Sequence, residues 1–143
     1  MRQVEKYRLW LGHVGDARDL KSLYSVGIEA VMDLALEESP NAGARDMVYC
    51  RIPLLDDTGN PDCRLRLAID TLVNLLRSDT PTLVHCGGGI NRTPVVAAAA
   101  IALIENSPLR ETLSRITAGW SCDISPGLFR HVDSLLDLPN GQT

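Results

Sequence analysis

Two spacings of apolar residues divide the chain into predicted strands and helices. Short apolar runs bounded by glycine, proline or aspartate are typical of strands buried in a sheet. Stretches with apolar residues three and four apart are typical of helices that cover such a sheet. The predicted strands are 7–11, 28–34, 47–54 and 82–84. The predicted helices run from Asp16 or Asp19 to about Ser25, where Gly27 follows, and then over 64–77, 94–104, 109–118 and 126–136, with a loop or short helix at 37–46 and a turn at 56–61.

This order of elements predicts an α/β fold. We expect a single domain over residues 1–143, built on a central, mostly parallel or mixed sheet of about four or five strands flanked by helices. A chain of 143 residues is long enough to bury a sizeable core. The ordered core is expected at about 5–137 and a frayed tail at 138–143.

Charge and composition narrow the classes of function. The formal net charge of −4 argues against a protein that binds nucleic acid through a general positive field. No apolar run reaches the roughly 18–20 residues of a membrane span, and the N-terminal residues have no apolar signal core. The 4 cysteines lack the spacing of a zinc or thioredoxin-type site. We therefore expect a cytoplasmic protein with free thiols and without a cofactor, a metal, or a nucleic-acid or membrane partner.

The segment most specific for chemistry is a glycine-rich loop between the strand at 82–84 and the helix that follows. Cys86 stands where the strand ends, and Arg92 stands where the helix begins. The backbone N–H groups of such a loop and the positive end of the helix favour a thiolate and a bound oxyanion. Arginine offers a fork of donors suited to two phosphoryl oxygens. The residues expected to bind phosphate are Gly87, Gly88, Gly89, Ile90, Asn91 and Arg92.

Two neighbours of this loop carry hydroxyl or imidazole groups. Neighbouring side chains on a strand point to opposite faces, so His85 is not placed to act as the base for Cys86. His85 is either a residue that organises the loop and helps to stabilise the thiolate, or a hydrogen-bonded core histidine. Thr93 fits the first turn of the helix, and its hydroxyl is also placed to donate to the thiolate as the thiolate leaves.

The loop contains no lysine of a Walker motif and no set of metal ligands. Phosphate chemistry without a metal needs a covalent nucleophile, and Cys86 is the candidate.

His85, Cys86, Gly89, Arg92 and Thr93 have the spacing of a known signature. The segment resembles the active-site loop of the cysteine-dependent protein tyrosine phosphatase superfamily. Residues 9–12, 16–20, 27–34 and 124–129 resemble segments of the dual-specificity branch, so the similarity spans nearly the whole chain. The small size, with the loop past the middle of the chain, resembles an atypical dual-specificity phosphatase.

The resemblance implies a general acid, an aspartate about thirty residues before the cysteine. Asp56 matches that position best, and Asp57 is the alternative. In isolation both would be ordinary turn residues before Gly59. Ser125 is expected to cap the helix that begins at Pro126; the alternatives are a hydrogen bond to the loop and the positioning of water.

The resemblance also implies the reaction: hydrolysis of phosphotyrosine and, with a shallow and permissive site, of phosphoserine or phosphothreonine, in a protein or peptide through a phosphocysteine intermediate. Phosphate or vanadate-like oxyanions are expected to bind the loop. The loop has no lysine or arginine between Cys86 and Arg92, which weighs against a phosphoinositide. The alternatives are a phosphatase of RNA 5′ ends or phosphoinositides, a catalytically weak phosphoprotein-binding module, and a rhodanese-like sulfurtransferase.

Overall fold

The computed structural model describes residues 1–41 and 43–137, so the tail expected at 138–143 lies outside the described residues. It contains one five-stranded sheet in the order β1-β2-β5-β3-β4. The strand β1 pairs antiparallel with β2, and the other neighbours pair in parallel. This confirms the predicted α/β fold with a mixed sheet. The strands are β1 (Arg2–Gln3), β2 (Leu9–His13), β3 (Ala30–Ala35), β4 (Val48–Leu54) and β5 (Thr82–Cys86).

Six helices occur in the described residues, and they differ from the prediction mainly near the N-terminus. The single helix expected there is two short helices, because His13 accepts bonds from the N–H groups that open the first and Asp19 caps the second. Asp16 is therefore not an N-cap; its carboxylate binds back to the His13 N–H in a capping box. The helices are α1 (Val14–Arg18), α2 (Leu20–Val26), α3 (Asp62–Arg77), α4 (Arg92–Glu105), α5 (Leu109–Ile116) and α6 (Pro126–Asp137).

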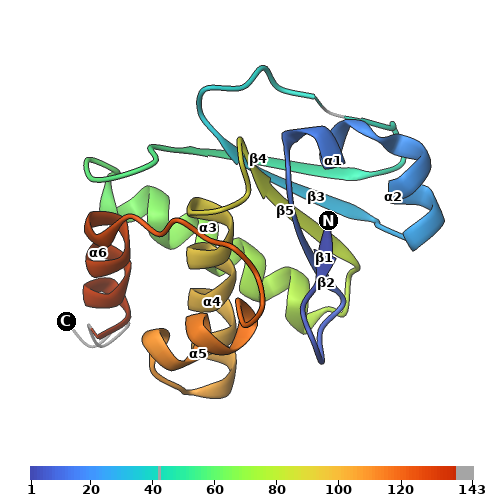
Figure 1. The fold of residues 1–143 in the computed structure, drawn as a ribbon. Helices are drawn as coiled ribbons and strands as arrows, with labels where there is room; N and C mark the ends of the chain where they lie inside the picture. Colours follow the sequence, from blue (N-terminus) through green and yellow to red (C-terminus); the bar gives the residue numbers. More distant parts are fainter. Residues whose placement is uncertain (42, 138–143) are drawn as a thin grey trace.

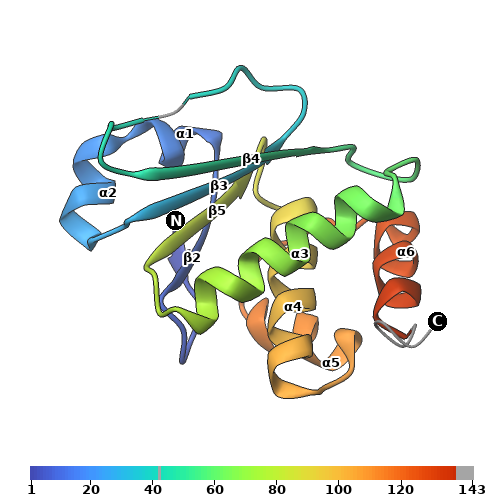
Figure 2. The same ribbon diagram turned by 180° about the vertical axis from the view of Figure 1, so that it is seen from behind.

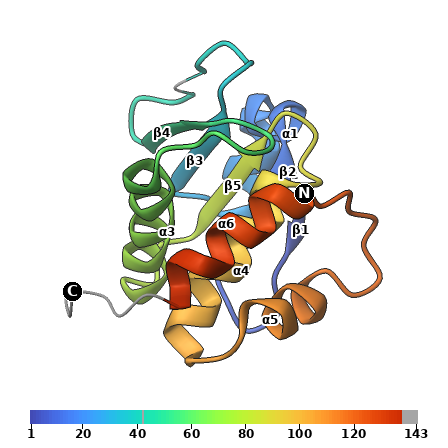
Figure 3. The same cartoon turned by 90° about the vertical axis from the view of Figure 1, so that its left-hand side faces the viewer.

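The helices form two layers, one on each face of the sheet. Figure 1 shows α1 and α2 on one side of the strands and α3 to α6 on the other, and Figure 3 shows the same division from the side. Figure 2 shows α3 crossing obliquely over α4, and the two helices are in contact. No helix among the described residues is long and apolar enough to cross a bilayer.

The alternation of side chains along each strand separates the two cores. On β5, Val84 and Cys86 belong to the larger core under α3 to α6, whereas Leu83 belongs to the smaller core under α1 and α2. On β3, Met32 belongs to the larger core and Val31 to the smaller core. The alternation places Cys86 and His85 on opposite faces of the sheet.

The helix α4 lies at the centre of the larger core. All of its residues from 92 to 102 are buried. A helix with apolar residues on every side is typical of an element enclosed by its neighbours. It touches β5, β2, α3, α5 and α6. The first turn of α4 is thereby fixed against the sheet, directly below the loop that follows Cys86.

Candidate active site

The candidate site lies at the carboxyl edge of the parallel strands. Cys86 is the last residue of β5, residues 87–91 form a loop, and α4 begins at Arg92. Because β2, β3, β4 and β5 are parallel, the segments that follow them meet at this edge. These segments supply Glu37 after β3 and Asp56 after β4.

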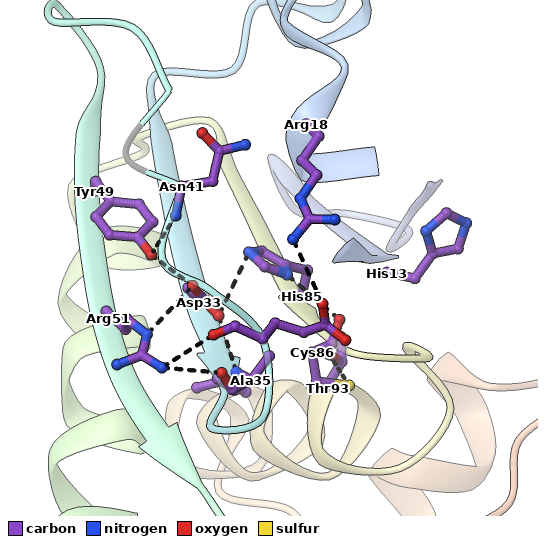
Figure 4. A network of polar contacts seen from close by, with 12 residues as sticks. His13, Arg18, Asp33, Ala35, Asn41, Tyr49, Arg51, His85, Cys86 and Thr93 are labelled. Carbon is purple, nitrogen blue, oxygen red and sulfur yellow. Dashed lines mark hydrogen bonds and ion pairs between the residues drawn. The ribbon is translucent and has the colours of Figure 1, made fainter. Parts of the chain in front are cut away.

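The Cys86 sulfur receives two hydrogen bonds. The Gly89 N–H donates to Sγ at 3.2 Å, and the Thr93 hydroxyl donates at 2.9 Å. Figure 4 shows Thr93 directly beside the sulfur. Both donors favour negative charge on the sulfur. Thr93 is fully buried in the first turn of α4, so its hydroxyl is held in this position.

The shape of the loop depends on Gly89. Its φ of 74° lies in the left-handed region, and a Cβ there would come within 2.6 Å of the Gly12 carbonyl oxygen on β2. Any other residue here would suffer both the backbone strain of the positive φ and the steric clash of its Cβ. The loop is also attached from outside, because the Val14 N–H donates to the Gly87 carbonyl and the Asp123 N–H donates to the Ile90 carbonyl.

Arg92 is buried and held by several acceptors. Its Nη1 and Nη2 atoms each donate to one Glu37 carboxylate oxygen at 2.7 Å, and Nη1 also donates to the Leu54 carbonyl at 2.9 Å. Burial acts most strongly on Arg92 and opposes its charge. The hydrogen bonds to Glu37 and the nearby negative groups outweigh burial, and the pKa of Arg92 is raised. The guanidinium is therefore a permanent cation at the loop.

One N–H of Arg92 has no hydrogen bond within the described residues. The Nε atom is buried and lies 3.3 Å from Asp56 Oδ1, but the geometry does not make a hydrogen bond. A buried donor without a partner is rare in proteins. This N–H suits an oxyanion that would bind over the loop.

The two candidate acids lie in different surroundings. Asp56 Oδ1 approaches Arg92 Nε and accepts a hydrogen bond from Asn91 Nδ2 at 2.7 Å. Asp57 turns toward the start of α6, where its Oδ1 accepts a hydrogen bond from the Ser125 hydroxyl at 2.6 Å. The Ser125 hydroxyl also accepts from the Leu128 N–H, as a helix cap does. Of the two aspartates, Asp56 is the one next to the arginine of the loop.

His85 lies on the opposite face of β5 from Cys86. Figure 4 shows its ring against Asp33, with Nε2 3.7 Å from Asp33 Oδ1. Its Nδ1 atom lies 3.4 Å from the Cys86 carbonyl oxygen and so contacts the backbone of the loop. Burial lowers the pKa of His85, and the Asp33 charge offsets this only in part. Because the ring does not face the sulfur, the geometry provides no role as a base for Cys86.

Sequence reasoning missed three residues that organise the site. Glu37 holds Arg92, and Asp33 is a buried carboxylate that accepts from the Tyr49 hydroxyl at 2.6 Å and the Ala35 N–H at 2.9 Å. Asn60 is buried and bonds both the N–H and the carbonyl of Leu55, which shapes the loop that carries Asp56. The positions of Asp33 and Glu37, at the carboxyl end of a buried strand and just after it, are a signal that could have identified them.

Comparisons with known proteins find similar sequences and a similar fold. No protein-family model matches the sequence. The chain is 28% identical to human dual specificity protein phosphatase 15 over 114 residues, which cover 77% of this chain and 37% of that protein. It is 29% identical to mouse dual specificity protein phosphatase 14 over 114 residues, which cover 77% of this chain and 56% of that protein. The chain is thus similar to the small atypical dual-specificity phosphatases. The crystal structure of DUSP15 superimposes with a TM-score of 0.80 at 25% identity and covers 96% of this chain and 87% of that one.

The matched region spans roughly a third to a half of the length of these two relatives. The superposition with DUSP15 shows that this chain has the dual-specificity phosphatase fold. Cys86, Arg92 and the candidate acid lie at the carboxyl edge of its sheet.

Proposed function

We propose that this chain is a cysteine-dependent phosphatase that acts on phosphotyrosine and, through a permissive site, on phosphoserine or phosphothreonine in proteins. The observation that carries the proposal is the arrangement around Cys86. Its sulfur accepts hydrogen bonds from Gly89 and Thr93, and Arg92 offers at the same loop a buried Nε–H that makes no hydrogen bond within the described residues. A nucleophile and an oxyanion site are thereby combined.

The first step of the proposed reaction forms a covalent intermediate. The Cys86 thiolate attacks phosphorus and forms a sulfur–phosphorus bond as the bond to the leaving oxygen breaks. Backbone N–H groups of residues 87–92 and the Arg92 guanidinium bind the phosphoryl oxygens. Protonated Asp56 gives its proton to the departing phenolate or alkoxide.

The second step releases phosphate. Asp56, now a carboxylate, takes a proton from a water molecule that attacks the phosphocysteine. The sulfur–phosphorus bond breaks, and the Thr93 hydroxyl stabilises the thiolate as it leaves, because it already donates to Sγ. The chain's own residues thus supply the nucleophile, the acid and the anion site.

Three exposed apolar side chains support an aromatic leaving group. Leu36 precedes Glu37, Leu55 precedes Asp56, and Ile90 belongs to the loop itself. Each is thus attached to the backbone beside a residue that contacts Arg92 or the loop. Apolar side chains beside the loop favour the phenyl ring of phosphotyrosine over a small alkyl chain.

All 4 cysteines are free, which supports our inference of a reducing compartment such as the cytoplasm.

The test is hydrolysis of an aryl phosphate in the presence of a metal chelator. We expect turnover that vanadate inhibits, and a phosphorylated Cys86 detected by mass spectrometry after rapid acid quenching. Cys86→Ser should abolish turnover, whereas Cys63→Ser, the same change at an exposed position on α3, should not change it. Turnover by Cys86→Ser would exclude Cys86 as the nucleophile, and a wild-type protein that binds phosphopeptides without turnover would support the binding module.

The acid is tested by a matched pair of variants. Asp56→Asn should lower kcat for poor leaving groups by about 10²–10⁴-fold, the usual contribution of general acid catalysis. Asp57→Asn should leave unchanged the limb of the pH–rate profile that reports the protonated acid. The reverse result would assign the acid to Asp57.

Parallel assays with phosphotyrosine, phosphothreonine, phosphoinositide and RNA 5′-phosphate substrates separate the substrate classes.

A further inference from the structure

The side chain of Asn91 does not do what its position predicts. Asn91 is the residue before the first turn of α4, where asparagine commonly accepts a hydrogen bond from the helix N–H groups. Here it makes no such bond. The residue is nevertheless buried, with 5% of its surface exposed. A buried amide must find other partners, and these partners indicate its role.

The amide of Asn91 joins three segments. Its Nδ2 donates to the Asp56 carbonyl at 2.6 Å and to Asp56 Oδ1 at 2.7 Å. Its Oδ1 accepts from the Ser125 N–H at 2.9 Å. The opposite amide orientation would set oxygen against two acceptors and NH₂ against a donor, so these partners determine the orientation. The Cys86 loop, the Asp56 loop and the segment before α6 are thereby tied together.

We infer that Asn91 is a positioning residue for the acid Asp56, and this inference rests on the proposed function. The Asp56 side chain is 67% exposed, so it would rotate freely without a partner. Two bonds from one amide to its carbonyl and its carboxylate fix that rotation. Because Oδ1 is occupied by Asn91 and faces Arg92, the proton delivered to the leaving group belongs on Oδ2.

Loss of this positioning has a distinct kinetic signature. A good leaving group, such as a nitrophenolate, departs with little help from an acid, whereas phenolate or an alkoxide needs the proton. Asn91→Ala should therefore lower kcat/KM about 10–100-fold for phenyl phosphate, part of the usual effect of general acid catalysis, and much less for nitrophenyl phosphate. The vanadate inhibition constant should stay unchanged, because the Asn91 backbone N–H and Arg92 remain.

The experiment compares Asn91→Ala and Asn91→Asp with Asn74→Ala, the alanine change at an exposed position on α3. Asn91→Asp keeps the shape of the side chain but sets an acceptor against the Asp56 oxygens. Its loss of activity should therefore be at least as selective for poor leaving groups as that of Asn91→Ala. The limb of the pH–rate profile that reports the protonated acid should become weaker in Asn91→Ala and in Asn91→Asp. Asn74→Ala should match the wild type with every substrate.

Two results would overturn the inference. An equal loss with good and poor leaving groups would assign Asn91 a general structural role. A raised vanadate inhibition constant with unchanged leaving-group dependence would assign its side chain to anion binding. Partial unfolding lowers activity toward all substrates alike, so it does not imitate the selective loss. Absence of wild-type turnover would instead refute the proposed function.

Discussion

Replacing Glu37 by glutamine would remove the carboxylate that holds Arg92 while keeping its shape. Both Glu37 oxygens accept from the guanidinium at 2.7 Å, and this hydrogen bonding lowers the pKa of Glu37 from its usual value of 4.5. The carboxylate is therefore charged throughout the neutral range. An oxyanion bound by Arg92 would lie next to it. The Glu37 carboxylate and the oxyanion would then both contact the Arg92 guanidinium.

The size of the effect follows from Coulomb's law. Two unit charges on the same guanidinium lie roughly 5 Å apart and repel by about 0.8 kcal/mol in a water-like dielectric. The Glu37 side chain is 51% exposed, so this high-dielectric end of the range applies. Such a repulsion corresponds to about a fourfold change in affinity. Arg92 would stay in place in the variant because it also donates to the Leu54 carbonyl at 2.9 Å.

The assay is the vanadate inhibition constant at neutral pH and moderate ionic strength. We expect Glu37→Gln to bind vanadate about fourfold more tightly. Glu38→Gln is the matched control, because Glu38 is the next residue and its carboxylate pairs with Arg18 and not with Arg92. Weaker vanadate binding by Glu37→Gln would refute the reasoning, because it would show that the carboxylate orients Arg92 more than it competes.

Three further outcomes are expected. Burial and the hydrogen bonds to Glu105 and Asp33 raise the pKa of Tyr7 and Tyr49 to about 12. Absorbance at alkaline pH should show two tyrosines that ionise near pH 12, and one in Tyr49→Phe. The stability that these two tyrosines contribute should be complete below pH 10 and should be lost as the pH rises through about 12. Burial lowers the pKa of His85, so its NMR titration should fall below 6.5 and its contribution to stability should decline as the pH falls from 6.5 toward the folded value. Leu72→Ala on α3, which is fully buried, should cost about 2–5 kcal/mol in urea unfolding, against about 0.5 kcal/mol or less for exposed Leu67→Ala.

The sequence was most informative where local pattern determines structure. The apolar runs and helical spacings located the four parallel strands and the helices from α3 to α6, because burial imposes those periods. The strand β1 was not predicted, since two residues are too few to show an alternation. The division of the first helix depends on His13 accepting backbone bonds through its ring nitrogen, a role that histidine seldom has at a helix start.

The site shows the same limit. Cys86, Arg92 and Thr93 lie close together in one strand–loop–helix segment, so their proximity can be read from the sequence. Glu37 reaches Arg92 across 55 positions of the chain, and only the pairing of strands brings them together. Asn91 was expected to bind phosphate in the loop after Cys86; it lies in that loop, and its phosphate binding stays a prediction. The direction of its side chain depends on the Asp56 and Ser125 segments, which no local pattern relates to the loop.

The enclosed helix α4 has a consequence for how such a protein can diversify. Eleven successive residues, 92–102, are buried, and four of them in a row are alanines for which larger side chains have no room. A saturation mutagenesis library should show this window as the least tolerant part of the chain. Changes of specificity must then come from the segments around Leu36, Leu55 and Ile90, whose side chains are exposed and can be replaced without disturbing the core. The mutational freedom of this domain lies in its loops, while the helix that orients Arg92 is constrained on every side.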